Sequence, residues 1–283
     1  MPAYFDTNVI RYLRVGLSGP LSDDMQSRIV LSPISAIEVL SQMADWTAGE
    51  DVLQSIHRLR DWLPEQAVLL SWLEPFYARN VFGIELEDEF FPIISEMLDR
   101  ALAADRISCR LRWAASRLRR VNENAKMRKA KLFQKAAERL RAEHLAPNEL
   151  DNRIRSDIKT GVAQKVGATY GAQTEAQIEQ RLSAYCDFHA RSVRRAVENA
   201  DFRFDSRQHL NDHFDGEQLL YLAAPENHFI SSDTGFDCIM NSQQAPQYHF
   251  IPAATLQDPA MAAVALRGVI DGCTQAHPAV GQG

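Results

Sequence analysis

Two aspartates in this sequence each follow a short apolar run, and their position suggests chemistry. Asp6 comes directly after the apolar residues 3–5, and Asp233 follows the run 229–232, which ends in two serines. Short apolar runs of this kind are typical of buried strands. In an open parallel sheet, ligand sites lie beyond the carboxyl ends of the strands. We therefore expect the two aspartates to share one crevice if their strands are neighbours.

Two further acids are placed to approach this crevice from helices. A helix is predicted to start at Pro33 with Ser32 as its cap, and Glu38 is the odd polar residue on its apolar stripe. Asp215 lies near the start of a helix predicted over 212–223, ahead of the strand at 228–231. Both carboxylates are expected to converge on the strand-end aspartates from the sides.

Four carboxylates in one pocket would repel each other and call for a counter-charge. At a separation of about 4 Å, each pair is disfavoured by roughly 4 kcal/mol at an effective dielectric near 20. Mg²⁺ and Mn²⁺ prefer oxygen ligands and would remove that cost. Two such ions can make a water more acidic and stabilise the leaving oxygen in an in-line displacement. The set therefore indicates metal-assisted hydrolysis of a phosphodiester.

The pattern along the chain predicts an α/β fold that a helical region interrupts. The first forty residues indicate strand, helix and strand, the run from about 51 to 199 is nearly all helical, and α/β patterning returns after Phe204. Strands are also expected at 28–31 and 248–251, and a closing helix at 264–270. The predicted division is a parallel-sheet core over 1–75 and 205–275, a helical insertion over 76–204, and a disordered tail over 276–283.

The charge of the chain is strongly segregated. Residues 106–141 hold thirteen Lys or Arg against two acids, a local net charge of +11, so the other residues sum to −17 within the total of −6. A basic helical segment can neutralise phosphates without reading sequence; a solvated helix face is the plainer alternative. The residues predicted to bind nucleic acid are Arg117, Arg119, Arg120, Lys126, Arg128, Lys129, Lys131 and Lys135.

Four segments together resemble the PIN-domain nucleases, a family that includes bacterial toxin ribonucleases. They are Phe5-Asp6-Thr7-Asn8, Ser35-Ala36-Ile37-Glu38-Val39-Leu40, Asp212-His213-Phe214-Asp215 ahead of Leu219-Leu220-Tyr221-Leu222, and Phe229-Ile230-Ser231-Ser232-Asp233-Thr234-Gly235-Phe236. The resemblance covers roughly residues 1–75 and 205–257. It implies a PIN-like, Rossmann-like core in which Asp6, Glu38, Asp215 and Asp233 are the catalytic residues and bind Mg²⁺ or Mn²⁺. It also implies RNA as the favoured substrate.

Some assignments stay open at this stage. Asp212 competes with Asp215 as a metal ligand, because the two acids lie three apart on one helical face. Thr7, Asn8, Ser231 and Ser232 are expected either to support the acids or merely to cap and end their elements. The tryptophans Trp62, Trp72 and Trp113 are expected to belong to the core. The interval from Glu38 to Asp215 is far longer than in the compact toxins, so the helical insertion lies outside the resemblance.

Composition narrows the remaining possibilities. The four cysteines are far apart and form no C-x-x-C pair, which argues against a zinc ribbon or a disulfide framework and favours a cytoplasmic setting. The leading hypothesis is an Mg²⁺- or Mn²⁺-dependent endoribonuclease, such as a toxin or a defence effector. The alternatives are a structure-specific DNA nuclease and a catalytically silent nucleic-acid-binding scaffold; a phosphatase ranks last, because it expects an aspartate where Asn8 stands. A homodimer or a regulatory protein partner is compatible with the long helical insertion, and no membrane association is expected.

Overall fold

A four-stranded parallel sheet forms the centre of the computed structural model, which describes residues 2–12, 26–60, 69–206, 209–210, 215–236 and 247–275. The strands are β1 (Ala3–Phe5), β2 (Ile29–Val30), β3 (His228–Ser231) and β4 (Tyr248–Phe250), in the order β2-β1-β3-β4. β1 pairs with β3 in parallel, with Phe5 opposite Ile230. The predicted α/β fold class and parallel sheet are confirmed, and the strands that precede the two aspartates are neighbours.

The helices next to the sheet begin where the sequence indicates. α1 (Thr7–Tyr12) follows β1 directly, and the predicted helix beyond residue 12 lies outside the described residues. α3 (Pro33–Gln42) has Pro at its start, and the Ser32 hydroxyl accepts a hydrogen bond from the Ser35 amide, as expected of a cap. The remaining elements around the sheet are α4 (Gly49–Arg60), the 3₁₀ helix η3 (Gly216–Ala223), the 3₁₀ turn η4 (Thr234–Phe236), α12 (Ala253–Gln257) and α13 (Pro259–Gln275).

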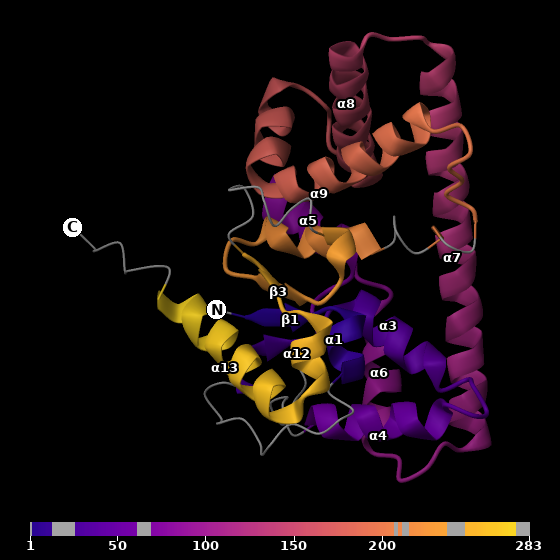
Figure 1. Ribbon diagram of the computed structural model, residues 1–283, viewed down its shortest axis with the longest axis vertical. Helices are drawn as coiled ribbons and strands as arrows, with labels where there is room; N and C mark the ends of the chain where they lie inside the picture. The colour runs from indigo at the N-terminus through magenta and orange to yellow at the C-terminus, as the bar shows by residue number, and fades with distance from the viewer. Residues whose placement is uncertain are drawn as a thin grey trace.

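The region between β2 and β3 is mostly helical, as predicted. Its elements are α5 (Leu73–Tyr77), the π-helix η2 (Ala78–Phe82), α6 (Phe91–Leu102), α7 (Cys109–Ala142), α8 (Pro147–Lys165) and α9 (Ala172–Glu198). α7 has 34 residues and is therefore about 51 Å long at 1.5 Å per residue. In Figure 1 it runs along one side of the whole molecule, from the level of α4 to the level of α8. Among the described helices, none is both long and apolar enough to cross a membrane.

The helical region shares its core with the sheet. Tyr4 of β1 stacks on Phe229 of β3 with ring centroids 5.0 Å apart, and both belong to the same buried cluster as Tyr185 of α9. On the other face, Phe5 and Ile230 pack in a cluster that also holds Leu111 of α7. Burial of these large side chains contributes roughly 1.5–3 kcal/mol each. The sheet and the helices around it are therefore one packed body, in which α7 is held beside the carboxyl ends of the strands.

Candidate active site

Asp6 lies at the point where β1 becomes α1. Its amide donates to the Ile230 carbonyl at 2.9 Å, which extends the β1–β3 pairing, and its carbonyl accepts from the Ile10 amide at 3.1 Å, which starts the helix. The carboxylate is almost completely buried, and its Oδ2 accepts a hydrogen bond from the Ser231 hydroxyl at 3.0 Å. The backbone thus fixes Asp6 at the strand end, and Ser231 fixes its side chain.

Asp233 is tied to Asp6 through the same serine. The Asp233 amide donates to Ser231 Oγ at 3.0 Å, so one hydroxyl contacts both strand-end aspartates. Asp233 Oδ1 accepts from the Gly235 amide at 2.7 Å, which opens the turn of η4 and orients the carboxylate. The sequence left open whether Ser231 only ends its strand; the structure gives it both contacts. Ser232 is partly exposed.

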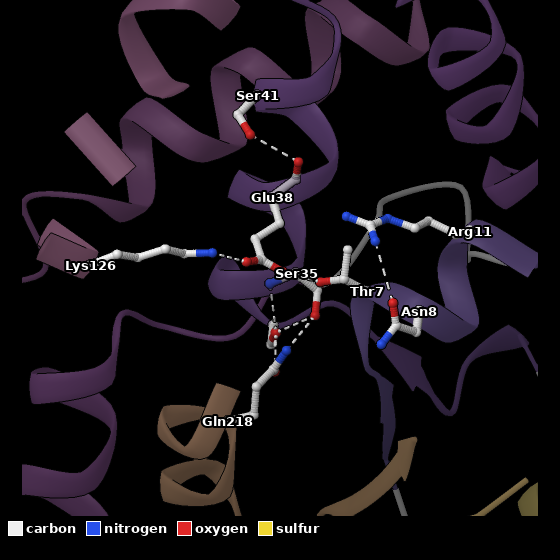
Figure 2. A network of polar contacts seen from close by, with 9 residues as sticks. Thr7, Asn8, Arg11, Ser35, Glu38, Ser41, Lys126 and Gln218 are labelled. Carbon is white, nitrogen blue, oxygen red and sulfur yellow. Dashed lines mark hydrogen bonds and ion pairs between the residues drawn. The ribbon is translucent and has the colours of Figure 1, made fainter. Parts of the chain in front are cut away.

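Glu38 reaches the cluster from α3 and is held by two partners. Thr7 Oγ1 donates to Glu38 Oε2 at 2.6 Å, and Lys126 of α7 forms an ion pair with Oε1. Figure 2 shows both contacts converging on the Glu38 carboxylate. The Glu38 side chain is 13% exposed and that of Lys126 only 9%, so this ion pair is shielded from water. The Thr7 hydroxyl therefore orients Glu38 rather than Asp6.

A buried hydrogen-bond network sets the position of α3. Ser35 Oγ donates to the Phe5 carbonyl at 2.8 Å, which joins the first turn of α3 to the end of β1. Gln218 of η3 donates to Ser35 Oγ at 2.8 Å (Figure 2). The Gln218 side chain also accepts a hydrogen bond from Ser32 Oγ at 2.7 Å. All three side chains are buried, and losing one partner would leave a polar group unsatisfied, at about 1–3 kcal/mol. β1, α3 and η3 are thereby locked together.

Asp215 directly precedes η3, at the same end of the sheet. A Cβ atom on the next residue, Gly216, would lie 2.5 Å from the ring of Phe188, so only glycine lets η3 pack this closely on α9. Because Asp215 is the neighbour of Gly216, this close packing fixes the position of its backbone. Asp212, the competing acid, lies outside the described residues, so the choice between the two stays open.

Electrostatics link the four carboxylates, because the charges of Glu38 and Asp233 act on both Asp6 and Asp215. The pKa of Asp6 is raised to about 7, first by burial and then by the nearby charges of Glu38 and Asp233, while the Ser231 hydrogen bond opposes the rise. The pKa of Asp215 is raised well above its ordinary value by burial and then by Glu38 and Asp6, while Lys126 lowers it. With all four acids ionised and Lys126 protonated, the cluster would carry a net charge of −3. We call Asp6, Glu38, Asp215 and Asp233 the acidic cluster.

The acidic cluster fits a hard divalent cation by its donor chemistry. Every donor is a carboxylate or hydroxyl oxygen, which suits Mg²⁺ or Mn²⁺ rather than zinc. Burial and the neighbouring carboxylates raise the pKa of Asp6 and of Asp215, and a bound cation would favour their ionised forms. In the part of the chain that the structure describes, no three His, Cys, Asp or Glu side chains are arranged to hold an ion as they stand. Thr7 and Lys126 engage both oxygens of Glu38 in this arrangement.

Asn8 plays no direct part in this arrangement. Its Oδ1 accepts from Arg11 at 3.4 Å, and Figure 2 shows the Asn8 side chain pointing toward Arg11 rather than toward Glu38. An amide–guanidinium contact of this length one turn along a helix is a local surface interaction. Of the four supporting residues that the sequence suggested, Thr7 and Ser231 contact the acids directly.

The basic segment divides into an exposed and an inward-facing group. Six of the eight predicted nucleic-acid-binding residues are exposed on α7: Arg117, Arg119, Arg120, Arg128, Lys131 and Lys135. Lys126 and Lys129 depart from the prediction, because they turn inward to ion pairs with Glu38 and Glu217. The reason is their place on the helix face that packs against the protein, where a lysine is stabilised only by an acid.

A second buried ionic cluster lies one turn away along α7. Glu217 of η3 is 2% exposed and forms an ion pair with Lys129, accepts a hydrogen bond from Tyr185 at 3.0 Å, and lies 3.4 Å from His189. Burial favours the neutral acid, but Lys129 and His189 hold the pKa of Glu217 well below its usual range. We call this set the Glu217 cluster. Its one carboxylate has a cation and a hydrogen-bond donor beside it, which keep it ionised although it is buried.

Sequence reasoning missed Lys126 as a partner of Glu38, although a signal was present. The buried residues of α7 recur every three to four positions and include Ala115, Asn122, Lys126, Ala130 and Ala137. A lysine inside such a stripe of small and amide residues needs a buried acid opposite it. The periodicity could therefore have set Lys126 apart from its exposed neighbours, but it could not have named Glu38, 88 residues earlier, as the partner.

Three comparisons with known proteins found no relative of this chain. No protein-family model matches the chain, and neither the curated proteins nor the solved structures gave a match.

Proposed function

We propose that this protein is a metal-dependent nuclease that hydrolyses phosphodiester bonds with Mg²⁺ or Mn²⁺. The observation that carries the proposal is the pair of strand-end aspartates, Asp6 and Asp233, joined through Ser231 and facing Glu38 and Asp215. The raised pKa values mark a site whose negative charge exceeds what the protein compensates, and such sites are commonly functional. The same four residues are those that the resemblance to the PIN-domain nucleases implies.

Each residue has a distinct part in the proposed site. Asp6 and Asp233 would hold the ion from the strand ends, while Glu38 and Asp215 would complete its surroundings directly or through water. A bound divalent ion supplies a more acidic water and stabilises negative charge on a leaving oxygen. Ser231 orients Asp6 and the start of the η4 turn, so that the two aspartates keep a fixed relation. Thr7 orients Glu38.

Lys126 supplies a positive charge from the protein itself to the acidic cluster. It neutralises Glu38 and lowers the pKa of Asp215, which reduces repulsion in the acidic cluster without a metal ion. An ammonium group also suits a phosphate oxygen, as a compact point charge. We assign Lys126 as a positioning residue: it stabilises the metal-free acidic cluster, and a divalent ion would compete with it for Glu38.

RNA is the substrate we favour, on the family resemblance alone. The nuclease would then be an endoribonuclease, such as a toxin or a defence effector. A structure-specific DNA nuclease would use the same site chemistry, since a metal ion held by the acids would contact phosphate oxygens and not the 2′-hydroxyl. The direct comparison offers the purified protein single-stranded RNA, tRNA, single-stranded DNA and branched DNA with Mn²⁺, and ranks the initial rates.

The test of the nuclease itself uses asparagine variants of the strand-end acids. We expect cleavage to require Mn²⁺ or Mg²⁺, to stop in EDTA, and to fall about 100-fold or more in Asp6→Asn and Asp233→Asn. Asp105→Asn is the matched control, because Asp105 is an exposed acid outside the cluster. Cleavage that persists in EDTA, or that Asp6→Asn leaves unchanged, would contradict the proposal and point to a contaminating enzyme.

The alternative of a silent scaffold makes the opposite prediction. A protein that has kept this arrangement without chemistry would bind nucleic acid through the exposed α7 residues, and no substrate would be cleaved at any Mn²⁺ concentration. Folded wild-type protein without activity on all four substrates, and without Mn²⁺ binding that Asp6→Asn removes, would favour the scaffold over the nuclease.

A further inference from the structure

A groove of about 720 Å³ lies between α6 and α7, with Ile37 of α3 among its lining residues. Its lining is largely apolar and includes aromatic side chains that are open to solvent. Trp113 of α7 is 66% exposed and Phe90 is 47% exposed, and both line the groove. The sequence had suggested a core position for Trp113, so its exposure is a departure from that prediction. Large apolar side chains gathered at an open groove mark a binding surface.

The aromatic rings offer flat faces at two places along the groove. Trp72 and Phe90 lie against each other with ring centroids 5.1 Å apart and a tilt of 36°. On α7, the guanidinium of Arg117 lies over the ring of Trp113 at 5.8 Å. Trp113 and Arg117 are four residues apart and so share one face of the helix. Aromatic and guanidinium planes presented together are the groups on which unpaired bases stack.

The groove also carries positive charge. Three arginines line it, Arg100, Arg110 and Arg117, against one acid, Glu96, which pairs with Arg100 at 2.5 Å. Arg110 and Arg117 flank Trp113 on α7, three and four residues away. A polyanion would meet cations and stacking surfaces in alternation along this helix.

One end of the groove is adjacent to the acidic cluster. Asn122 and Ala125 of α7 line it, and Lys126, one helical turn after Asn122, is the residue paired with Glu38. The four residues from Asn122 to Lys126 correspond to about 6 Å along the helix axis, at about 1.5 Å per residue. On α3, Ile37 lines the groove and Glu38 follows it. A chain that lies in the groove would therefore run toward the acids.

We propose that this groove binds the unpaired nucleotides next to the phosphate that the acidic cluster attacks, with bases on Trp113 and Phe90 and phosphates on Arg110 and Arg117. The inference rests on the proposed nuclease function for the direction of the strand, while the binding itself does not depend on metal or cleavage. Paired bases are stacked inside a duplex and cannot present their faces to these rings. The groove thus selects single strands over duplexes.

The test measures binding without catalysis. Asp6→Asn protein in EDTA is titrated into fluorescein-labelled twelve-nucleotide oligo(U) and oligo(dT) and into a blunt twelve-base-pair RNA duplex, with anisotropy as the readout. We expect both single strands to bind at least 10-fold more tightly than the duplex and to quench tryptophan fluorescence. Trp113→Ala and Arg117→Glu, each added to Asp6→Asn, should weaken single-strand binding about 10-fold, the order of magnitude of one lost base stack.

Two control variants on the same helix separate the groove from the rest of α7. Leu132→Ala removes a side chain that is 67% exposed and does not line the groove, and Arg139→Glu reverses an exposed charge that lies outside the groove and outside the predicted nucleic-acid-binding residues. Both should bind the single strands within about twofold of the parent. Equal losses in the groove variants and the controls would overturn the proposal, because binding would then be spread over the basic face of α7.

The remaining outcomes are also decisive. Oligonucleotides that bind through the groove without ever being cleaved would support this inference and count against the nuclease. If short single strands are cleaved equally well by the wild type, Trp113→Ala and Arg117→Glu, the nuclease proposal would be supported and the groove proposal would be contradicted. A dimer in sedimentation that Trp113→Ala dissociates would assign the groove to a second copy of the chain. Tight binding of an acidic amphipathic peptide, with no oligonucleotide binding, would assign it to a protein partner.

Discussion

Helix α7 inserts two lysines, three residues apart, into two buried carboxylate clusters that differ in charge balance. Lys129 meets one carboxylate, Glu217, which Tyr185 and His189 also contact. Lys126 meets Glu38, one of four carboxylates that face each other. The pKa values of the acids shift in opposite directions. The pKa of Glu217 is held well below its usual range, whereas the pKa of Asp6 is raised to about 7.

The two clusters differ in their balance of charge. Both clusters are buried, and both connect α7 to the α/β core. In the Glu217 cluster, Lys129 offsets the charge of the one carboxylate, and Tyr185 donates a hydrogen bond to it. The acidic cluster holds more negative charge than its lysine can offset, which is costly for the folded protein unless a cation binds. Breaking the first should therefore destabilise the fold, and relieving the second should stabilise it.

The largest expected effect comes from removing the acid of the balanced cluster. Glu217→Ala leaves the buried ammonium of Lys129 uncompensated, and the free energy of unfolding should fall by about 3–5 kcal/mol. Urea unfolding followed by circular dichroism measures this. Glu198→Ala is the control, since Glu198 forms an exposed pair with Arg194 and should cost at most about 1 kcal/mol. Equal effects of the two variants would remove the distinction between buried and surface pairs here.

Relieving the unbalanced cluster should have the opposite sign. Because the folded-state pKa of Asp6 lies near 7 and the unfolded value near 3.8, ionised Asp6 lowers stability as pH rises through that interval. In EDTA at pH 8, Asp6→Asn should raise the free energy of unfolding by about 2–4 kcal/mol. The difference from wild type should grow from pH 4 to 7 and then level off. A destabilised Asp6→Asn at pH 8 would show that the carboxylate is compensated.

If Lys126 and a metal ion compete for Glu38, removing Lys126 should have two smaller effects: lower stability without metal and higher affinity for Mn²⁺. Lys126→Met removes the cation paired with Glu38, so we expect the metal-free protein to lose about 1–3 kcal/mol of stability. The freed carboxylate should bind Mn²⁺ about 10-fold more tightly in isothermal titration calorimetry. Lys131→Met, an exposed site on the same helix, should change neither quantity. Weaker Mn²⁺ binding by Lys126→Met would mean that the lysine supports the ion instead of competing with it.

The smallest effect concerns the pH dependence of the balanced cluster. Burial lowers the pKa of His189, and the Lys129 charge adds to this, while the hydrogen bond to Glu217 opposes it. The unfolded chain therefore takes up the proton first, and stability is lost as pH falls below about 6.5. One proton limits the slope to about 1.4 kcal/mol per pH unit. His189→Gln should flatten the pH 5–7 profile of urea midpoints, and an unchanged slope would exclude His189 as its source.

The parts of the fold that local patterns control could be predicted from sequence. Apolar runs that end at Asp6 and Asp233, and a Ser-Pro start at residue 32, gave the strands and the cap of α3, because periodicity and capping are local. The meeting of the strand-end acids followed from parallel-sheet geometry. The helix predicted over 212–223 is a buried 3₁₀ helix over Gly216–Ala223, since tertiary packing decides its winding, and residues 212–214 lie outside the described residues.

The missing parts are those that depend on distant partners. Lys126 and Lys129 read as surface charges because Glu38 and Glu217 are 88 residues away in either direction along the chain. Ser35 and Gln218 gave no sequence signal for the network that joins α3 to η3, since a serine or a glutamine alone is compatible with any surface. The exposure of Trp113 could not be predicted from the sequence either, because it depends on how the neighbouring helices pack.

The most direct test of the central claim is the anomalous scattering of Mn²⁺ in crystals of the wild-type protein. We predict a peak at the carboxyl ends of β1 and β3, in contact with the carboxylates of Asp6 and Asp233, and absent from crystals of Asp6→Asn grown in the same solution. Glu38 should then contact the ion or its water instead of Lys126. A folded protein whose acidic cluster shows no peak at saturating Mn²⁺, with Lys126 still paired to Glu38, would contradict the account.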